Sequence, residues 1–265
     1  MYRVTGEIGR KLVWFSCGAT SAVAWKIAVE EYGKENILPV YCDVGSEHAD
    51  NKRFLADCEK WVGQKVTILK HPNFKNIDEV FEDRRFLVGP KGAPCTMLLK
   101  REVREMFQNH DDLHIFGYDA DEIARAASFA TRNHENFYAP LIKHGIDHAG
   151  ARAIIANAGI ELPVMYKLGY NHNNCIGCVK GGAGYWNKIR LEFPEVFQRR
   201  AEQERKFNFA LNSKTVKGVK YKVFLDELDP DAGRDEKLDE MKCDFNCSAA
   251  VEKFDFNNSI DKKEV

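Results

Sequence analysis

Residues 11–33 read KLVWFSCGATSAVAWKIAVEEYG, and this stretch decides the fold. Its first part, KLVWFS, is a short apolar run that ends in small residues, which is typical of a buried strand. From residue 22 onward the apolar residues recur at helical spacing, up to the glycine at 33. The sequence therefore predicts a strand, a small-residue loop and a helix in direct succession.

The same alternation continues further along the chain. The predicted strands are 37–43, 65–71 and 113–118, and the predicted helices are 48–62, 76–84, 95–108 and 119–134. Strands and helices that alternate in this way imply a parallel sheet with right-handed crossovers. We therefore expect an α/β fold with a doubly wound, mainly parallel sheet.

The regular alternation ends near residue 140. Beyond it we predict a short helix at 149–156, a glycine- and asparagine-rich loop at 169–184, and a long polar helix that ends near 207. Residues 217–228 are predicted to form a strand or one arm of a hairpin. We therefore divide the chain into an α/β domain, 1–207, and a small cysteine-containing C-terminal extension, 208–265, with a polar tail.

Composition excludes some classes of protein. The net charge of −1 over 265 residues argues against binding nucleic acid through bulk charge, so such binding would need a local basic patch. No run approaches the roughly 18 to 20 apolar residues that cross a bilayer, and the first residues lack the apolar core of a signal peptide. We expect a cytoplasmic protein without membrane contact. Its eight cysteines then favour metal, cluster or redox chemistry over structural disulfides.

The small-residue loop after the first strand is a candidate phosphate site. Ligands of parallel sheets lie at the carboxyl ends of strands, where helix N-termini attract anions. Gly18 allows a close approach of the backbone, and the hydroxyls of Ser16, Thr20 and Ser21 can bond phosphate oxygens. Cys17 lies inside the same loop, where reach of a bound nucleotide and a small buried side chain explain it equally well. Helix capping by the same hydroxyls is the alternative.

Three segments in order resemble a known group of enzymes. FSCGATSAV, residues 15–23, resembles the SGGxDS loop of the PP-loop ATP pyrophosphatases and the SFG-type loop of the phosphoadenosine phosphosulfate (PAPS) reductases. The triplet Asp43-Val44-Gly45 is similar to the DTG element of these reductases. Residues 117–125, GYDADEIAR, are similar to their G-x-R-x-x-E-S-x-x-R segment. The resemblance implies the adenine nucleotide alpha-hydrolase-like fold and a bound adenine nucleotide: ATP, APS (adenosine phosphosulfate) or PAPS.

The resemblance also assigns roles to residues outside the loop. It implies that Asp43 bonds the ribose or base, with Gly45 beside it, and that Gly117, Glu122 and Arg125 belong to the nucleotide site. The alternative for Asp43 is a carboxylate that caps its own turn. Glu122 and Arg125 are three residues apart on a predicted helix, so an ordinary ion pair is the alternative for them.

The cysteines form a second candidate site. Cys175 and Cys178 are two residues apart in a glycine-rich turn, and Cys95 opens a predicted helix whose dipole favours the thiolate. Resemblance to the reductases that carry a 4Fe-4S cluster implies that these three cysteines are ligands. Cys243 is the candidate fourth ligand, and either Cys243 or Cys247 is the candidate catalytic thiol. A three-cysteine cluster with an open iron, an all-cysteine zinc site, and free or redox thiols are the alternatives.

Lys180 follows the cysteine pair and is a candidate ligand of phosphate or sulfate, with a solvated lysine as the alternative. The leading hypothesis for function is reduction of an adenylyl sulfonucleotide with electrons from a thioredoxin-like partner. The second is an ATP-dependent sulfurtransferase that thiolates a base in tRNA or DNA. The third is a noncatalytic nucleotide-sensing subunit, which Thr20 favours because it stands where the pyrophosphatases have an aspartate. The oligomeric state is left open.

Overall fold

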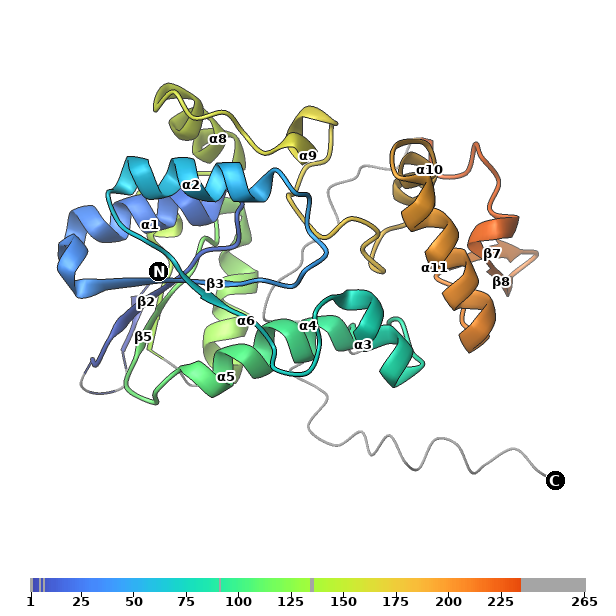
Figure 1. The fold of residues 1–265 in the computed structure, drawn as a ribbon, viewed down its shortest axis with the longest axis horizontal. Helices are drawn as coiled ribbons and strands as arrows, with labels where there is room; N and C mark the ends of the chain where they lie inside the picture. The colour runs from blue at the N-terminus through green and yellow to red at the C-terminus, as the bar shows by residue number, and fades with distance from the viewer. Residues whose placement is uncertain (1, 5, 7, 91, 134–135, 235–265) are drawn as a thin grey trace.

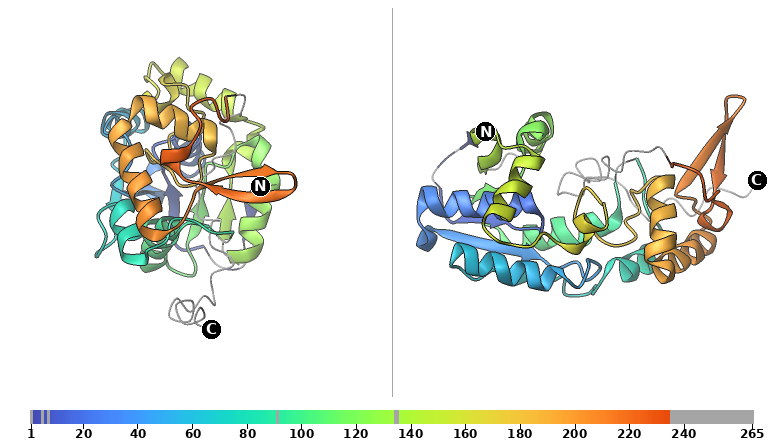
Figure 2. Two further views of the ribbon diagram at one scale, coloured as in Figure 1. Left: turned by 90° about the vertical axis from the view of Figure 1, so that its right-hand side faces the viewer. Right: turned by 90° about the horizontal axis from the view of Figure 1, so that it is seen from above.

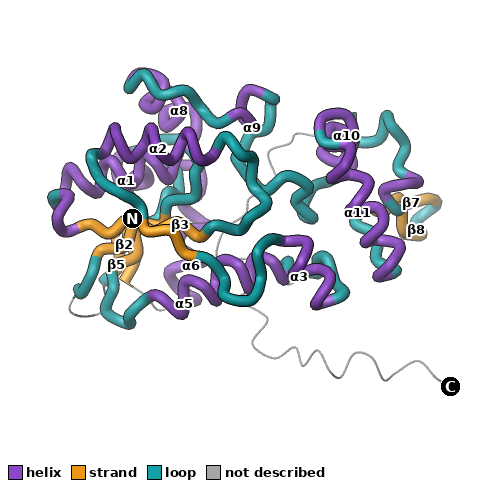
Figure 3. Tube along the Cα trace, viewed as in Figure 1, coloured by secondary structure: helices purple, strands orange, loops and turns teal. Residues whose placement is uncertain are grey.

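A five-stranded parallel sheet forms the centre of the protein (Figures 1 and 3). The computed structural model describes residues 1–265 except 1, 5, 7, 91, 134–135 and 235–265. The parallel strands are β2 (Lys11–Trp14), β3 (Ile37–Cys42), β4 (Thr67–Leu69), β5 (Leu113–Ile115) and β6 (Asn136–Tyr138). They lie in the order β6-β5-β2-β3-β4, and β1 (Tyr2–Arg3) pairs antiparallel with β6 at one edge.

Helices cover both faces of this sheet because side chains alternate along the buried strands. Val13 of β2 packs into the cluster on one face, while Leu12 and Trp14 pack into the cluster on the other. The first face carries α1 (Ala19–Tyr32), α2 (Asn51–Val62), α7 (Pro140–His144) and α8 (His148–Asn157). The second face carries α5 (Val103–Phe107) and α6 (Ile123–Asn133). The predicted doubly wound α/β architecture is confirmed.

The parallel part of the sheet has one strand more than the sequence indicated. The last strand that we predicted before the alternation ends near residue 140 was 113–118, but β6 continues the parallel sheet beside β5. Its three residues are all buried, and three residues are too few to show a period of two. The strand order reverses at β2, which has β3 on one side and β5 on the other. This pair of neighbours marks the topological switch point of the sheet.

Two predicted helices are interrupted. The segment predicted as one helix at 95–108 consists of α4 (Pro94–Thr96), the π-helical turn η2 (Met97–Glu102) and α5. The long polar helix ending near 207 is two helices, α10 (Ala183–Glu192) and α11 (Pro194–Phe207). Proline at the first position of α11 cannot donate a helical hydrogen bond, so a new helix begins there.

A second cluster of elements lies beside the sheet domain (Figure 1). It contains α9 (Val164–Lys167), α10 and α11, together with the 3₁₀ turn η4 (Leu225–Glu227). α3 (Ile77–Arg84) packs between this cluster and the sheet domain and shares a core with Cys175 and Val179. The hairpin of β7 (Asn212–Val216) and β8 (Val219–Val223) extends from the end of α11 (Figure 2).

The remaining short elements are η1 (Lys34–Asn36) and η3 (Ala120–Glu122). Among the helices in the described ranges, none is long and apolar enough to cross a membrane.

Candidate functional site

A cavity opens at the carboxyl ends of β2, β3 and β5, at the switch point of the sheet. Its empty space, with the open mouth included, is about 970 Å³. Open parallel sheets bind ligands at this place because loops and helix N-termini converge there. The walls include aromatic side chains from all three strand ends, namely Trp14, Phe15, Tyr41, Phe116 and Tyr118.

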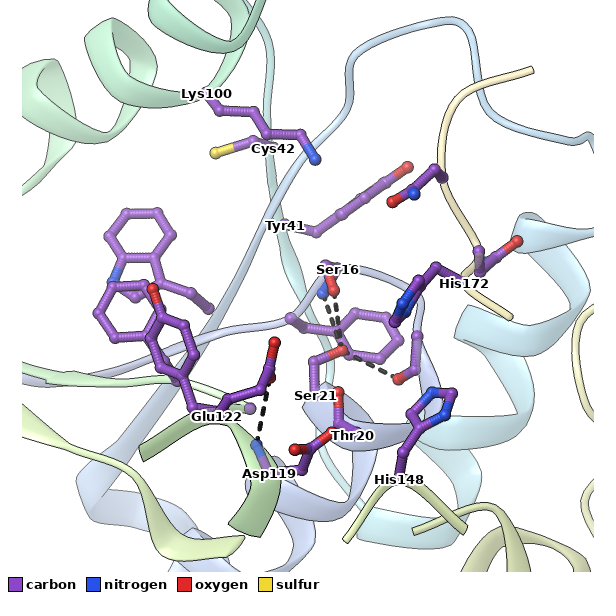
Figure 4. A pocket seen from close by; sticks show the side chains of 18 of the residues that line it. Ser16, Thr20, Ser21, Tyr41, Cys42, Lys100, Asp119, Glu122, His148 and His172 are labelled. Carbon is purple, nitrogen blue, oxygen red and sulfur yellow. Dashed lines mark hydrogen bonds between the residues drawn. The ribbon is translucent and has the colours of Figure 1, made fainter. Parts of the chain in front are cut away.

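The predicted phosphate loop forms the floor of this cavity (Figure 4). Ser16, Gly18, Thr20 and Ser21 all line it, and α1 begins at Ala19, so the positive end of that helix borders the cavity. The Ser21 hydroxyl donates to the Gly18 carbonyl oxygen at 2.9 Å and accepts from the Ser16 amide at 3.1 Å. The loop is therefore held in a fixed shape by its own hydroxyls.

Cys17 shapes the loop through its backbone. Its φ of 55° lies in the left-handed region, and its side chain is fully buried, with Sγ 3.9 Å from the Asn51 carbonyl oxygen. Burial and the nearby Glu47 carboxylate raise the pKa of the Cys17 thiol well above its usual value. The thiol is therefore neutral and faces the core, while the carbonyl oxygen accepts a hydrogen bond of 2.7 Å from Asn173 Nδ2.

The opposite wall combines a carboxylate, a phenol and an ammonium group. Glu47 accepts from the Tyr41 hydroxyl and from Asn51 Nδ2, the latter at 2.9 Å. Burial raises the pKa of Glu47, and the charge of Lys100 opposes that shift. Lys100 extends from η2 toward Tyr41 and the floor of the cavity (Figure 4). Burial raises the pKa of the neighbouring Cys42 thiol to about 12, so that thiol stays protonated at neutral pH.

Glu122 and Arg125 line a third wall and pair with each other. The Arg125 guanidinium donates to one carboxylate oxygen of Glu122, and the other oxygen accepts from the Asp119 amide at 3.3 Å. Arg125 also lies over the Tyr118 ring, 5.5 Å from its centroid. The ion pair that was the alternative for these two residues is present, and it lies at the cavity predicted for the nucleotide.

Gly117 allows the third wall to approach the phosphate loop. A Cβ at this position would lie 2.6 Å from the Ser21 amide nitrogen and 2.7 Å from the Ser21 Cα. Both are backbone atoms at the start of α1, so neither can rotate away. The glycine therefore sets the distance between β5 and the helix that borders the cavity.

Asp43 and Gly45 lie outside the lining of this cavity. Asp43 Oδ1 accepts from the Gly45 amide at 2.9 Å, and Oδ2 lies 3.0 Å from Lys70 Nζ. Gly45 has a φ of 64°, and a Cβ there would lie 1.9 Å from the Lys75 carbonyl oxygen. The geometry is that of the turn-capping alternative for Asp43. A nucleotide contact by Asp43 stays a prediction.

The cysteine pair lies in a loop that is hydrogen-bonded to the loop at the carboxyl end of β3. The Ile176 amide donates to the Ser46 carbonyl oxygen at 2.9 Å, which joins this loop to the loop after β3. Cys175 packs in the same apolar cluster as Cys95 of α4, and Cys178 packs in the adjoining cluster of α10 and α11. The Tyr185 hydroxyl accepts from the Cys178 amide at 2.9 Å and lies 3.4 Å from the Cys175 carbonyl oxygen.

A buried arginine lies against the loop of Cys175 and Cys178. Arg200 of α11 is 1% exposed and donates to the Gly177 carbonyl oxygen between the two cysteines at 3.4 Å. Burial lowers the pKa of this guanidinium, and the charges of Asp78, Cys95 and Cys178 oppose that shift. The Arg200 side chain thus joins α11 to the cysteine loop.

The chemistry of these donors fits an iron–sulfur cluster or zinc, which both accept thiolates. In the described ranges, however, no three His, Cys, Asp or Glu side chains are close enough together to hold a metal ion. Cys243 and Cys247, the candidates for a fourth ligand or a catalytic thiol, lie outside the described residues. Lys180 follows Cys178, is half-buried, and lies outside the lining of the cavity.

Sequence reasoning missed several residues of the cavity. Lys100 lies on the π-helical turn, and a pattern that assumes a regular helix cannot show which way it points. Glu47 could have been found, because it follows a predicted strand at its carboxyl end, where ligand residues of parallel sheets lie. His148 and His172 lie next to each other at the cavity with ring centroids 5.2 Å apart (Figure 4).

Comparison with known proteins adds no family to this description. A scan against protein-family models finds no match, and a search of curated proteins finds no significantly similar sequence.

Proposed function

We propose that this protein binds an adenine nucleotide in the cavity and carries out sulfur chemistry with its cysteines. The observation that supports this most directly is the cavity at the switch point, with Ser16, Thr20, Ser21 and the N-terminus of α1 as its floor. The aromatic walls suit an adenine ring, and the floor suits phosphates. The loop of Cys175 and Cys178 is hydrogen-bonded to the same edge of the sheet.

The leading reaction is reduction of a sulfonucleotide, in line with the resemblance to the PAPS reductases. A cysteine thiolate attacks the sulfur of APS or PAPS, the sulfur–oxygen bond breaks, and the nucleotide leaves with its phosphate. A thioredoxin-like dithiol then displaces sulfite from the cysteine and is oxidised to a disulfide. Cys95, Cys175 and Cys178 would hold a 4Fe-4S cluster, which would supply positive charge density for the reaction.

Sulfite release from APS or PAPS with reduced thioredoxin tests this reaction. Protein purified without oxygen should contain about four irons, as a 4Fe-4S cluster requires. We expect C243S or C247S to abolish sulfite release and Cys58→Ala, a change of a fully buried cysteine in α2, to retain it. No release by iron-loaded protein would rule out sulfonucleotide reduction, and stoichiometric zinc without iron would rule out the cluster.

A second candidate function is supported by the acidic side chains of the cavity. Glu47, Asp119 and Glu122 line it together with Lys100 and Arg125. Carboxylates repel a bare sulfonucleotide but can hold Mg²⁺, which accompanies ATP. This mixture favours an ATP-dependent enzyme that activates a nucleobase and thiolates it. Release of AMP or pyrophosphate that depends on added tRNA or DNA would distinguish it, and tight ATP binding without turnover would support a nucleotide-sensing subunit instead.

A further inference from the structure

The β7–β8 hairpin concentrates positively charged side chains on a protein that is nearly neutral as a whole. Residues 212–223, NSKTVKGVKYKV, contain four lysines and no acidic residue, whereas the whole chain has a net charge of −1. Every residue from 213 to 222 is exposed. The hairpin projects away from the helices that carry it (Figure 2). Its surface is therefore available to a partner with negative charge.

The register of the hairpin sorts its side chains onto two faces, because directly opposed residues share a face. Ser213 pairs with Lys222 and Thr215 with Lys220, which makes one face polar and cationic. On the other face Lys214 pairs with Tyr221 and Val216 with Val219. The exposed fractions on this second face are 49% for Tyr221, 46% for Val216 and 53% for Val219. An aromatic ring and two aliphatic side chains thus lie uncovered beside a lysine.

The lysines of the hairpin differ from the basic residues of the neighbouring helix. On α11, Arg199, Arg205 and Lys206 all form ion pairs with acidic side chains. In the part of the chain that the structure describes, Lys214, Lys217 and Lys220 form no ion pair. The positive charge on α11 is balanced locally, and the charge on the hairpin is available for binding.

The base of the hairpin is firmly attached. Glu204 of α11 is fully buried and accepts hydrogen bonds from the amides of Leu211 and Leu225, one at each end of the hairpin. Leu225 is also fully buried. A two-stranded hairpin is only marginally stable alone, so this attachment explains how an exposed ribbon keeps its shape. A rigid, charged ribbon binds with little loss of conformational entropy.

We propose that the β7–β8 hairpin binds single-stranded nucleic acid. The lysines neutralise backbone phosphates, and Tyr221 stacks against a base while the two valines cover its edge. The exposed aromatic ring beside lysines favours nucleic acid over an acidic peptide, which has no bases to stack. The proposal stands independently of the nucleotide in the cavity, since it rests on the hairpin alone.

The test uses the full-length protein and a fluorescent single-stranded RNA of about 20 nucleotides, longer than most single-strand sites. Fluorescence anisotropy is measured over a series of salt concentrations. We expect the triple variant K214Q/K217Q/K220Q to bind at least tenfold more weakly at about 0.1 M salt, with a log–log salt slope lower in magnitude by about 2. Tyr221→Ala should weaken binding about fivefold or more and leave the salt slope unchanged.

A matched control separates the hairpin from net charge. Lys34, Lys52 and Lys60 are exposed on the sheet domain, and their replacement by glutamine changes the net charge equally. RNA binding by this control should equal that of the unmodified protein. Equal losses in both triple variants, or no RNA binding by the unmodified protein, would overturn the proposal. Lysine-dependent binding to phosphatidylserine vesicles in the absence of RNA binding would overturn it in favour of a membrane surface.

Discussion

Two loops leave the same edge of the sheet and use their polar groups differently. The Ser16 loop, residues 16–18 after β2, lines the cavity with the start of α1. The Asp43 loop, residues 43–46 after β3, bonds the protein itself, through Gly45, Lys70 and the Ile176 amide. Each loop follows a strand, and we predicted a nucleotide contact for residues of each loop. Position at a strand end therefore indicates where a ligand can bind, and the local hydrogen bonds decide which loop has groups left for it.

The largest expected effect concerns the Asp43 loop. Gly45→Ala should lower the free energy of unfolding by about 3 to 5 kcal/mol, because its Cβ would lie 1.9 Å from the Lys75 carbonyl oxygen at a positive φ. Urea unfolding measures this. Gly63→Ala is the control, since its φ of 76° is similar but no atom lies within 4 Å, and it should lose only about 1 kcal/mol. Equal losses would contradict a packing role for Gly45.

The stability of the protein should depend on pH through β2, the strand that leads into the Ser16 loop. Trp14 Nε1 donates to His114 Nδ1 at 3.0 Å, and burial lowers the pKa of His114 from 6.5 to about 3. Its contribution to stability is fully present above pH 6.5 and is lost as the pH falls toward 3, because only the unfolded chain takes up the proton. We expect a loss on the order of 3 kcal/mol over this window, measured by urea unfolding. H114Q should flatten the profile there, and an unchanged profile would refute the assignment.

A pair of serine variants compares the two loops directly. Ser21→Ala removes the hydroxyl that holds the Ser16 loop, so nucleotide affinity should fall about tenfold with a loss of stability near 1 kcal/mol. Ser46→Ala removes the acceptor of the Ile77 amide at 3.1 Å and should cost similar stability without changing nucleotide affinity. Calorimetry with ATP, APS and PAPS provides the affinities. The reverse pattern would place the nucleotide at the Asp43 loop.

The smallest effect is expected for Asp43→Asn. The amide keeps an acceptor for the Gly45 amide and loses only the exposed ion pair with Lys70, so stability should change by less than about 1 kcal/mol. Nucleotide affinity should stay within about twofold of the unmodified protein. A tenfold or larger loss of affinity would show that Asp43 binds the ribose or base after a rearrangement of its turn.

Local sequence patterns predicted most strands of the sheet and the loop at the floor of the cavity. They failed where packing between distant segments determines the secondary structure. Helical and strand periods over residues 11–62 are strong because these elements are buried on defined faces. The three-residue strand β6 and the π-helical turn η2 exist through tertiary packing, which no local period records. Ser16, Thr20, Ser21, Glu122 and Arg125 line one cavity, since they follow neighbouring strands, and their contact with a nucleotide stays a prediction. The position of Lys100 at the cavity depends on a π-helical turn that no sequence pattern marks.

Asn173 has a consequence for how the two candidate sites behave together. Its side-chain nitrogen donates to the Cys17 carbonyl oxygen and, at 2.8 Å, to Asn51 Oδ1. A displacement of the cysteine loop would leave these buried acceptors without a hydrogen bond. This would cost about 1 to 3 kcal/mol of stability. The loop of Cys17 and the cysteine loop are thus joined through one buried amide. By linkage, a ligand of the cavity that favours one position of the cysteine loop must bind more tightly to protein whose loop is held in that position.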